Sequence, residues 1–171
     1  MTKITCDSII FDMDGVLVTN ASYCQAIKKT VELVLRTKYN LRKTVKPTYI
    51  QSLKSITGFN NDWDTSFALI KLLGQGTDVD ELRQRVELIS PQTRASQEYQ
   101  EVKNIFQTFY LGKNLSDGLI TQEILLIDRG LLSELAAIYP LAIATSRPRF
   151  EALFAAKNLK LSPLIKTRFI V

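Results

Sequence analysis

Apolar positions recur along most of the chain with the spacing of an amphipathic helix. After Tyr23, the residues Ile27, Val31, Val34 and Leu35 fall on one helical face. Similar stripes predict further helices near residues 47–56, 62–73, 82–89, 99–110, 131–138 and 150–154. Most of the chain is therefore expected to be helical.

Several helix ends are marked by residues that favour them. Proline suits the first turn of a helix, short polar side chains cap the amino end, and glycine commonly ends the last turn. Proline also follows a helix that has stopped. The expected markers are Pro47, Asn61 or Asp62, the capping box of Asp78 and Glu81, Pro91 as a stop, and Gly112.

Three short apolar runs are instead typical of buried strands. They cover residues 8–11, 141–145 and 167–171, and a helical stripe precedes or follows each of the last two. The order is strand, long helical block, helix, strand, helix, strand. It predicts an α/β fold, with a core of residues 1–19 and 129–171 and an all-helical insertion at residues 20–128.

Polar residues follow the first two of these runs. Asp12 and Asp14 lie one residue apart after the first strand, and Thr145 ends the second. Because ligands gather at the carboxyl ends of parallel strands, these two ends can form one site. A surface turn or part of a calcium loop is the alternative for the two aspartates, but the apolar residues 16–18 follow where a calcium loop needs ligands.

The composition of the chain excludes several classes of catalytic mechanism. The 171 residues include no histidine, which removes Ser-His-Asp hydrolysis and zinc-protease chemistry. Cys6 and Cys24 lack metal-binding spacing, and we expect them to be buried and reduced. With no apolar run of membrane-spanning length and no secretory signal, we expect a cytoplasmic protein without a membrane partner.

The net charge of +5 is concentrated in one stretch. Between Ala21 and Thr57 the only acid is Glu32, and the simplest interpretation is a solvated helix face. Attraction of an anionic substrate is the alternative. Without interleaved aromatic residues or an RNA-binding signature, no nucleic-acid partner is expected. The basic residues are Lys28, Lys29, Arg36, Lys38, Arg42, Lys43, Lys46 and Lys54.

Two motifs carry a resemblance to a known family. Residues 12–17, DMDGVL, resemble the first motif of the haloacid dehalogenase superfamily, and residues 141–145 resemble the second. The helical insertion is similar to the C1 cap of the phosphoglycolate-phosphatase-like subfamily. The resemblance implies a Rossmann-like core with a parallel sheet, plus an inserted helical cap.

The resemblance also implies a function, which is Mg²⁺-dependent hydrolysis of a small phosphorylated metabolite. Asp12 would be the nucleophile that forms an aspartyl-phosphate, and Asp14 the acid and base. Mg²⁺ would bind the Asp12 carboxylate and the Asp14 carbonyl oxygen. Gly15, Thr145, Ser146 and Arg147 would bind phosphate. Asn60, Asn61 and Trp63 are candidate substrate contacts in the cap, with helix capping as the alternative for the polar ones.

Two further family motifs have no counterpart here. They are a lysine beyond the third strand and an acidic pair after a fourth. The chain is therefore expected to be the amino-terminal part of a phosphatase, with an unpaired sheet edge beside the first strand that permits self-association. Two alternatives stay open: a non-catalytic protein that binds phosphate or a partner, and a phosphomutase that uses the same aspartates.

Overall fold

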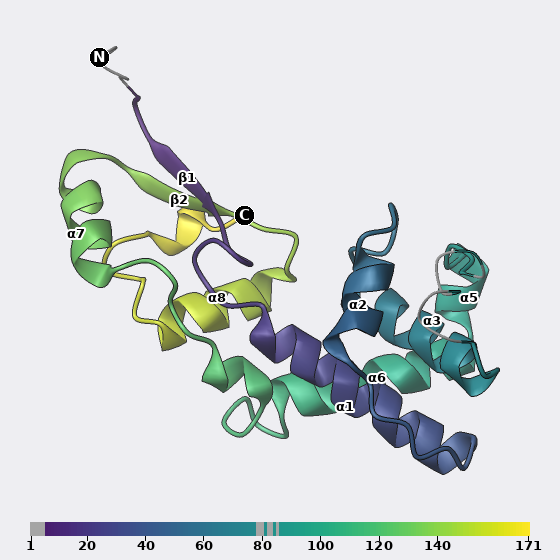
Figure 1. Cartoon of the computed structure of the whole chain (residues 1–171). Helices are drawn as coiled ribbons and strands as arrows, with labels where there is room; N and C mark the ends of the chain where they lie inside the picture. Colours follow the sequence, from purple (N-terminus) through teal and green to yellow (C-terminus); the bar gives the residue numbers. More distant parts are fainter. Residues whose placement is uncertain (1–5, 78–80, 82–83, 85) are drawn as a thin grey trace. The chain divides into compact units, whose positions relative to one another are not determined.

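The computed structural model describes residues 6–77, 81, 84 and 86–171. The fold is mixed α/β and rich in helix, with a small parallel sheet (Figure 1). The chain divides into two compact units. The first contains the chain up to Ala21 and from Thr121 to Val171, and the second runs from Ser22 to Ile120.

The sheet lies in the first unit, where β1 (Ile9–Asp12) and β2 (Leu141–Ala144) run side by side (Figure 1). They are parallel, with Ile9 opposite Leu141 and Asp12 opposite Ala144. Ile9 and Phe11 pack against the core, whereas Ile10 is 65% exposed. The expectation of a fully buried first strand was therefore wrong, because only one face of β1 is covered by the rest of its unit.

The core of the first unit forms between this sheet, the loop after β1 and two helices. These helices are α7 (Arg129–Ile138) and α8 (Arg149–Asn158). Asp128 caps α7 by accepting a hydrogen bond from the Leu131 amide at 2.9 Å. The core residues are Met13, Leu17, Val18, Leu132, Leu141, Ile143, Ala152, Ala155, Ala156, Leu161, Ile165 and Ile170.

The segment that leads into α7 also packs with the first unit. It follows η2 (Leu119–Gln122), a short 3₁₀ helix. The Leu126 amide donates to the Leu17 carbonyl at 2.8 Å, and the Thr19 amide donates to the Ile124 carbonyl at 3.1 Å. The helical insertion was expected to end at residue 128, whereas the second compact unit ends at Ile120.

The last predicted strand, at residues 167–171, was wrong. The chain instead forms η3 (Thr167–Phe169), in which the Phe169 amide donates to the Lys166 carbonyl at 2.8 Å. Pairing with β2 is limited to the end of the run, where Ile170 makes a parallel bridge with Ile143 and the Val171 amide donates to the Ile143 carbonyl at 3.0 Å. The local 3₁₀ hydrogen bond closes a turn that an extended strand cannot contain.

The second unit is helical. Pro47 lies in the first turn of its helix, Asn61 caps the next helix, and Gly112 follows the last one at φ +71°, so three predicted boundaries are confirmed. α3 packs against α2 and α6, and α5 packs against α6. The helices are α1 (Ala21–Lys38), α2 (Pro47–Lys54), α3 (Asp62–Gly74), α5 (Pro91–Ala95) and α6 (Gln97–Leu111).

The predicted helix at residues 82–89 is only partly open to comparison. Its capping residue Asp78 and its first apolar residue Leu82 lie outside the described residues. Residues 86–90 are described and are not helical. Pro91 starts α5 rather than following a helix, and the Ser90 hydroxyl caps it by accepting from the Thr93 amide at 3.0 Å.

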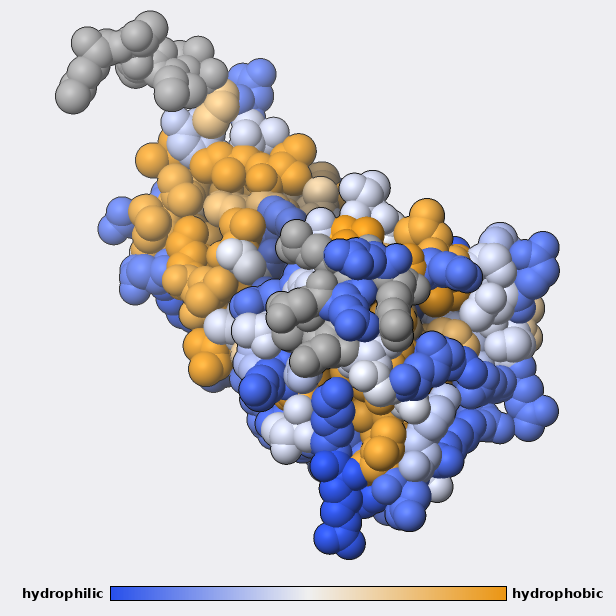
Figure 2. Space-filling view, turned by 45° about the vertical axis from the view of Figure 1, so that its right-hand side comes forward, coloured by the Kyte–Doolittle hydropathy of each residue, from blue (hydrophilic) through white to orange (hydrophobic). Residues whose placement is uncertain are grey.

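Large apolar side chains are exposed on the first unit, and Figure 2 shows apolar surface in the upper left of the view. The exposed apolar residues of this unit are Ile10, Val16, Ile124, Leu126, Leu131, Ile138, Phe150, Phe169 and Val171. Within the described part of the chain, no helix has both the length and the apolar character to cross a membrane.

Both cysteines are free thiols. Cys6 is exposed and Cys24 is half-buried, so the expectation of two buried cysteines was wrong for Cys6.

Candidate active site at the carboxyl ends of the strands

Asp12 is the last residue of β1 and its side chain lies at the surface. The Met13 amide donates to Oδ1 of this carboxylate at 2.6 Å, which holds the carboxylate over the turn that follows. Asp12 is opposite Ala144 in the parallel register, so Thr145 follows directly on the neighbouring strand. Neighbouring strands are about 4.8 Å apart, which brings Asp12 and Thr145 to one edge of the sheet.

The turn after Asp12 depends on Gly15. Its φ of +77° lies in the left-handed region, and its amide donates to the Val18 carbonyl at 2.8 Å. No heavy atom lies within 4 Å of where a Cβ atom would be, so backbone conformation rather than space favours glycine here. This tight turn reverses the chain directly after Asp14.

The Asp14 carboxylate binds Arg147. Arg147 Nε donates to Oδ2 at 2.9 Å and Nη2 donates to Oδ1 at 2.5 Å. Nη1 of the same guanidinium donates to Glu123 at 3.0 Å. The side chains of Arg147 and Glu123 are 2% and 0% exposed, whereas that of Asp14 is 31% exposed. Asp14 is thus the outer end of a network that is otherwise buried.

Glu123 was absent from the predicted site. One signal was available in the sequence, because this acid directly precedes the apolar run at residues 124–127 and follows Thr121 and Gln122 after another apolar pair. A carboxylate that is buried beside such a run needs a partner. The sequence pattern does not name that partner, which lies 24 residues further along the chain.

Thr145 and Ser146 lie between β2 and α8. The Thr145 amide donates to the Val171 carbonyl at 2.8 Å, and its hydroxyl oxygen accepts from the Arg147 amide at 3.2 Å. Ser146 is exposed. Their phosphate contacts stay a prediction, as does that of Arg147.

The three predicted substrate contacts of the cap lie in the second unit, and each has different neighbours. Asn61 Oδ1 accepts from the Trp63 and Asp64 amides at 2.8 and 3.2 Å, so this side chain caps α3. Asn60 is exposed. The Trp63 ring is half-buried, and Lys103 Nζ lies 4.0 Å from its centroid. Substrate contact by these residues stays a prediction.

A second buried carboxylate, Asp64, lies in the same helical unit and is 1% exposed. The Tyr99 hydroxyl donates to it at 2.6 Å, and Arg94 donates from Nε and Nη2 at 3.2 and 2.7 Å. Burial and the hydrogen bond to Asp64 raise the pKa of Tyr99 well above its usual range. The cluster joins α3, α5 and α6, so its arrangement favours a structural role over a chemical one.

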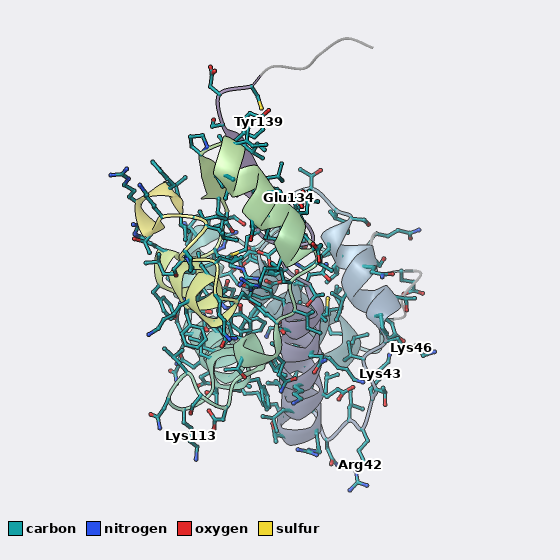
Figure 3. The ribbon with its side chains drawn as sticks, turned by 90° about the vertical axis from the view of Figure 1, so that its left-hand side faces the viewer. Arg42, Lys43, Lys46, Lys113, Glu134 and Tyr139 are labelled. Atoms are coloured by element: carbon teal, nitrogen blue, oxygen red, sulfur yellow. The ribbon has the colours of Figure 1, made fainter. Side chains whose placement is uncertain are left out.

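The basic stretch contributes exposed charge in the second unit. Arg42, Lys43 and Lys46 project outward from the connection between α1 and α2 (Figure 3). Lys43 Nζ lies 5.7 Å from the centroid of the Tyr49 ring. Solvated positions of this kind agree with the simpler of the two interpretations, and attraction of an anionic substrate stays a prediction.

This edge of the sheet offers some, but not all, of the ligands that a metal ion needs. Among residues 6–77, 81, 84 and 86–171, no group of three or more His, Cys, Asp or Glu side chains gathers as metal ligands do. The Asp12 carboxylate is nevertheless exposed at the strand end. Mg²⁺ commonly uses one or two carboxylates together with waters and substrate phosphate, so a single carboxylate with a carbonyl oxygen suits it better than a metal that needs a full protein cage.

Comparison with known proteins supports a phosphatase fold. The structure is similar to that of the phosphatase Tt82 from Thermococcus thioreducens, with a TM-score of 0.73 and 27% identity over 89% of this chain and 68% of that one. A structural genomics target, ZR25, shares the fold with a TM-score of 0.67 and 19% identity over 96% of this chain and 69% of the other. No protein-family model and no curated protein sequence matches the chain.

Proposed function

We propose that the chain is a Mg²⁺-dependent phosphatase of the haloacid dehalogenase type, acting on a small phosphorylated metabolite. The observation that carries the proposal is the parallel pairing of β1 with β2. It brings Asp12, with Asp14 two residues on, to the same edge as Thr145. The similarity to the phosphatase Tt82 supports the same class of reaction. In this proposal, the first unit is the α/β core and the second is the cap over the substrate.

The proposed reaction has two steps. Asp12 attacks phosphorus, the bond to the leaving oxygen breaks, and Asp14 gives its proton to that oxygen. Water then attacks the aspartyl-phosphate, Asp14 takes a proton from it, and inorganic phosphate leaves Asp12 regenerated. The Thr145 hydroxyl and the amides before α8 would hold the phosphate oxygens.

Mg²⁺ would be held by the Asp12 carboxylate and the Asp14 carbonyl oxygen, with phosphate and water completing its ligands. When bound, it would offset the negative charge of the carboxylate and phosphate that must approach each other. The metal is therefore expected to bind more tightly when phosphate is present.

A non-catalytic phosphate-binding protein is the second candidate, because the Thr145 hydroxyl and the amides before α8 could hold phosphate without any turnover. A phosphomutase is a third candidate, because it uses the same two aspartates but passes the phosphoryl group to a second substrate hydroxyl rather than to water.

Turnover of p-nitrophenyl phosphate and acetyl phosphate with Mg²⁺ separates these candidates. The phosphatase proposal predicts release of inorganic phosphate by the wild type and its loss, by at least about 10³-fold, in Asp12→Asn, which keeps the shape but not the nucleophile. Binding of inorganic phosphate without turnover of either compound would support the non-catalytic candidate. Turnover that requires an added sugar phosphate would support the phosphomutase.

A further inference from the structure

The Arg147 guanidinium is already bound by protein groups on both sides. Two of its nitrogens donate to the two oxygens of Asp14, and a third donates to Glu123. Such a fork fixes the plane of a carboxylate as well as its position. Asp14 therefore cannot turn about its side-chain bonds without giving up one of these hydrogen bonds.

The three residues come from three separate parts of the first unit. Asp14 follows β1, Arg147 precedes α8, and Glu123 follows η2. The backbone amide of Arg147 also donates to the Thr145 hydroxyl oxygen at 3.2 Å. The network thus links the predicted acid and base to the predicted phosphate-binding residue.

Burial separates the roles within the network. Glu123 is 0% exposed and Arg147 2% exposed at their side chains, so neither presents its charged group to solvent, whereas Asp14 is 31% exposed. A buried arginine is stabilised only if its charge is paired, and Glu123 supplies the second negative charge. Glu123 is linked to Asp14 through Arg147.

We infer that Arg147 and Glu123 are positioning residues that aim the Asp14 carboxylate at the leaving group, rather than ligands of the phosphate. The inference rests on the proposed phosphatase function. A general acid must come within hydrogen-bonding distance of the atom it protonates, so a carboxylate held in one orientation serves better than one that rotates. The bidentate contact orients the ionised carboxylate before substrate arrives. When Asp14 takes up the proton that it later donates, the protonated oxygen gives up its hydrogen bond from Arg147 and the other oxygen stays held.

The two roles of Arg147 predict different kinetics. kcat/KM covers the steps up to departure of the leaving group, in which Asp14 would act as the acid. Phenolate needs this proton much more than p-nitrophenolate does, although the two substrates bind with the same phosphate. A positioning role makes an Arg147 variant lose more activity on phenyl phosphate than on p-nitrophenyl phosphate, whereas loss of a phosphate ligand slows both equally.

The test compares kcat/KM for these two substrates in the wild type, Arg147→Lys and Glu123→Gln. We expect Arg147→Lys to lose about tenfold or more activity on phenyl phosphate beyond its loss on p-nitrophenyl phosphate. Glu123→Gln should change the ratio of the two kcat/KM values in the same direction. This second variant tests the inference if Arg147→Lys does not fold. The control is Arg129→Lys, since Arg129 donates to the Leu159 and Lys160 carbonyls and should leave the ratio unchanged.

Each remaining outcome is decisive. Equal losses on both substrates in Arg147→Lys would assign Arg147 to the phosphate and overturn the inference. An unchanged ratio in both folded variants would overturn it as well. A wild type that hydrolyses neither substrate would contradict the proposed function itself, and with it any positioning role, so the two failures are distinct.

Discussion

At the scale of single residues, the buried carboxylates Glu123 and Asp64 have different surroundings. Glu123 pairs with Arg147, which also binds a partly exposed aspartate at a strand end. Asp64 pairs with Arg94 and Tyr99 from neighbouring helices, where a buried acid would otherwise be costly. The first arrangement reaches the surface through a candidate catalytic group, and the second ties helices together.

The Tyr99 hydroxyl should make the stability of the second unit sensitive to high pH. Its raised pKa keeps it protonated in the folded state, whereas an unfolded tyrosine ionises near pH 10. Above about pH 10 the unfolded state holds fewer protons than the folded state. The contribution of the Tyr99 hydroxyl to the free energy of unfolding is therefore complete below about pH 10 and falls as the pH rises further. Tyr99→Phe has no hydroxyl to ionise at this position, so its free energy of unfolding should not show this fall.

Urea unfolding of the wild type and Tyr99→Phe at several pH values measures this contribution. The wild type should be more stable near pH 7 by about 1–2 kcal/mol, because the variant leaves Asp64 without one of its donors. That advantage should shrink by about 1 kcal/mol between about pH 8 and about pH 11. A constant difference across this range would show that Tyr99 does not titrate as its surroundings require.

The network at the strand ends also shows what a sequence can and cannot reveal about a site. Asp12, Asp14 and Thr145 could be predicted as candidates because they belong to short motifs at the ends of apolar runs. The contact between Asp14 and Arg147 joins residues 133 positions apart, and Glu123 belongs to no motif. Contacts of that kind depend on how separate segments pack, which local periodicity does not encode.

At the scale of helices and strands, local chemistry predicted most boundaries correctly. Asn61 caps α3 and Gly112 follows α6 because each residue satisfies or permits the backbone geometry of a helix end. The apolar run at residues 167–171 was misleading, since Ile170 is buried whereas Phe169 and Val171 are exposed. Pairing with β2 begins only at the end of this run, with the bridge of Ile170 and the backbone hydrogen bonds of Val171.

The cap at Asn61 is open to a direct test. Asn61→Ala removes the acceptor for the Trp63 and Asp64 amides and should lower the free energy of unfolding by about 1 kcal/mol. Asn60→Ala is the matched control, because Asn60 accepts from Lys54 through its backbone carbonyl, and its change should stay within about 0.5 kcal/mol. Urea unfolding of the three proteins gives both values, and equal losses would contradict the capping role.

The same pair of variants tests the predicted cap contacts. If Asn61 serves α3 alone, kcat/KM for p-nitrophenyl phosphate should be unchanged in Asn61→Ala under conditions where the protein is fully folded. A loss of activity in either folded variant would instead assign that asparagine to the substrate. Stability and turnover thus report on the two alternative roles separately.

At the scale of the whole molecule, a local motif and the global fold point to the same class of reaction. The strand that ends at Asp12 pairs in parallel with the strand that precedes Thr145, and the fold as a whole is similar to that of a phosphatase. Within the described residues, β1 has β2 as its strand partner. Self-association through the other edge of β1 stays a prediction.

The most direct test of the proposed function is to locate a phosphoryl group on the chain. The protein is incubated with acetyl phosphate and Mg²⁺, quenched, and reduced with borohydride, which converts an aspartyl-phosphate into homoserine that peptide mass spectrometry can place. We expect conversion at Asp12 alone, with a larger trapped fraction in Asp14→Asn and none in Asp12→Asn. Phosphate release by the wild type with conversion at another aspartate, or at none, would contradict the proposed function.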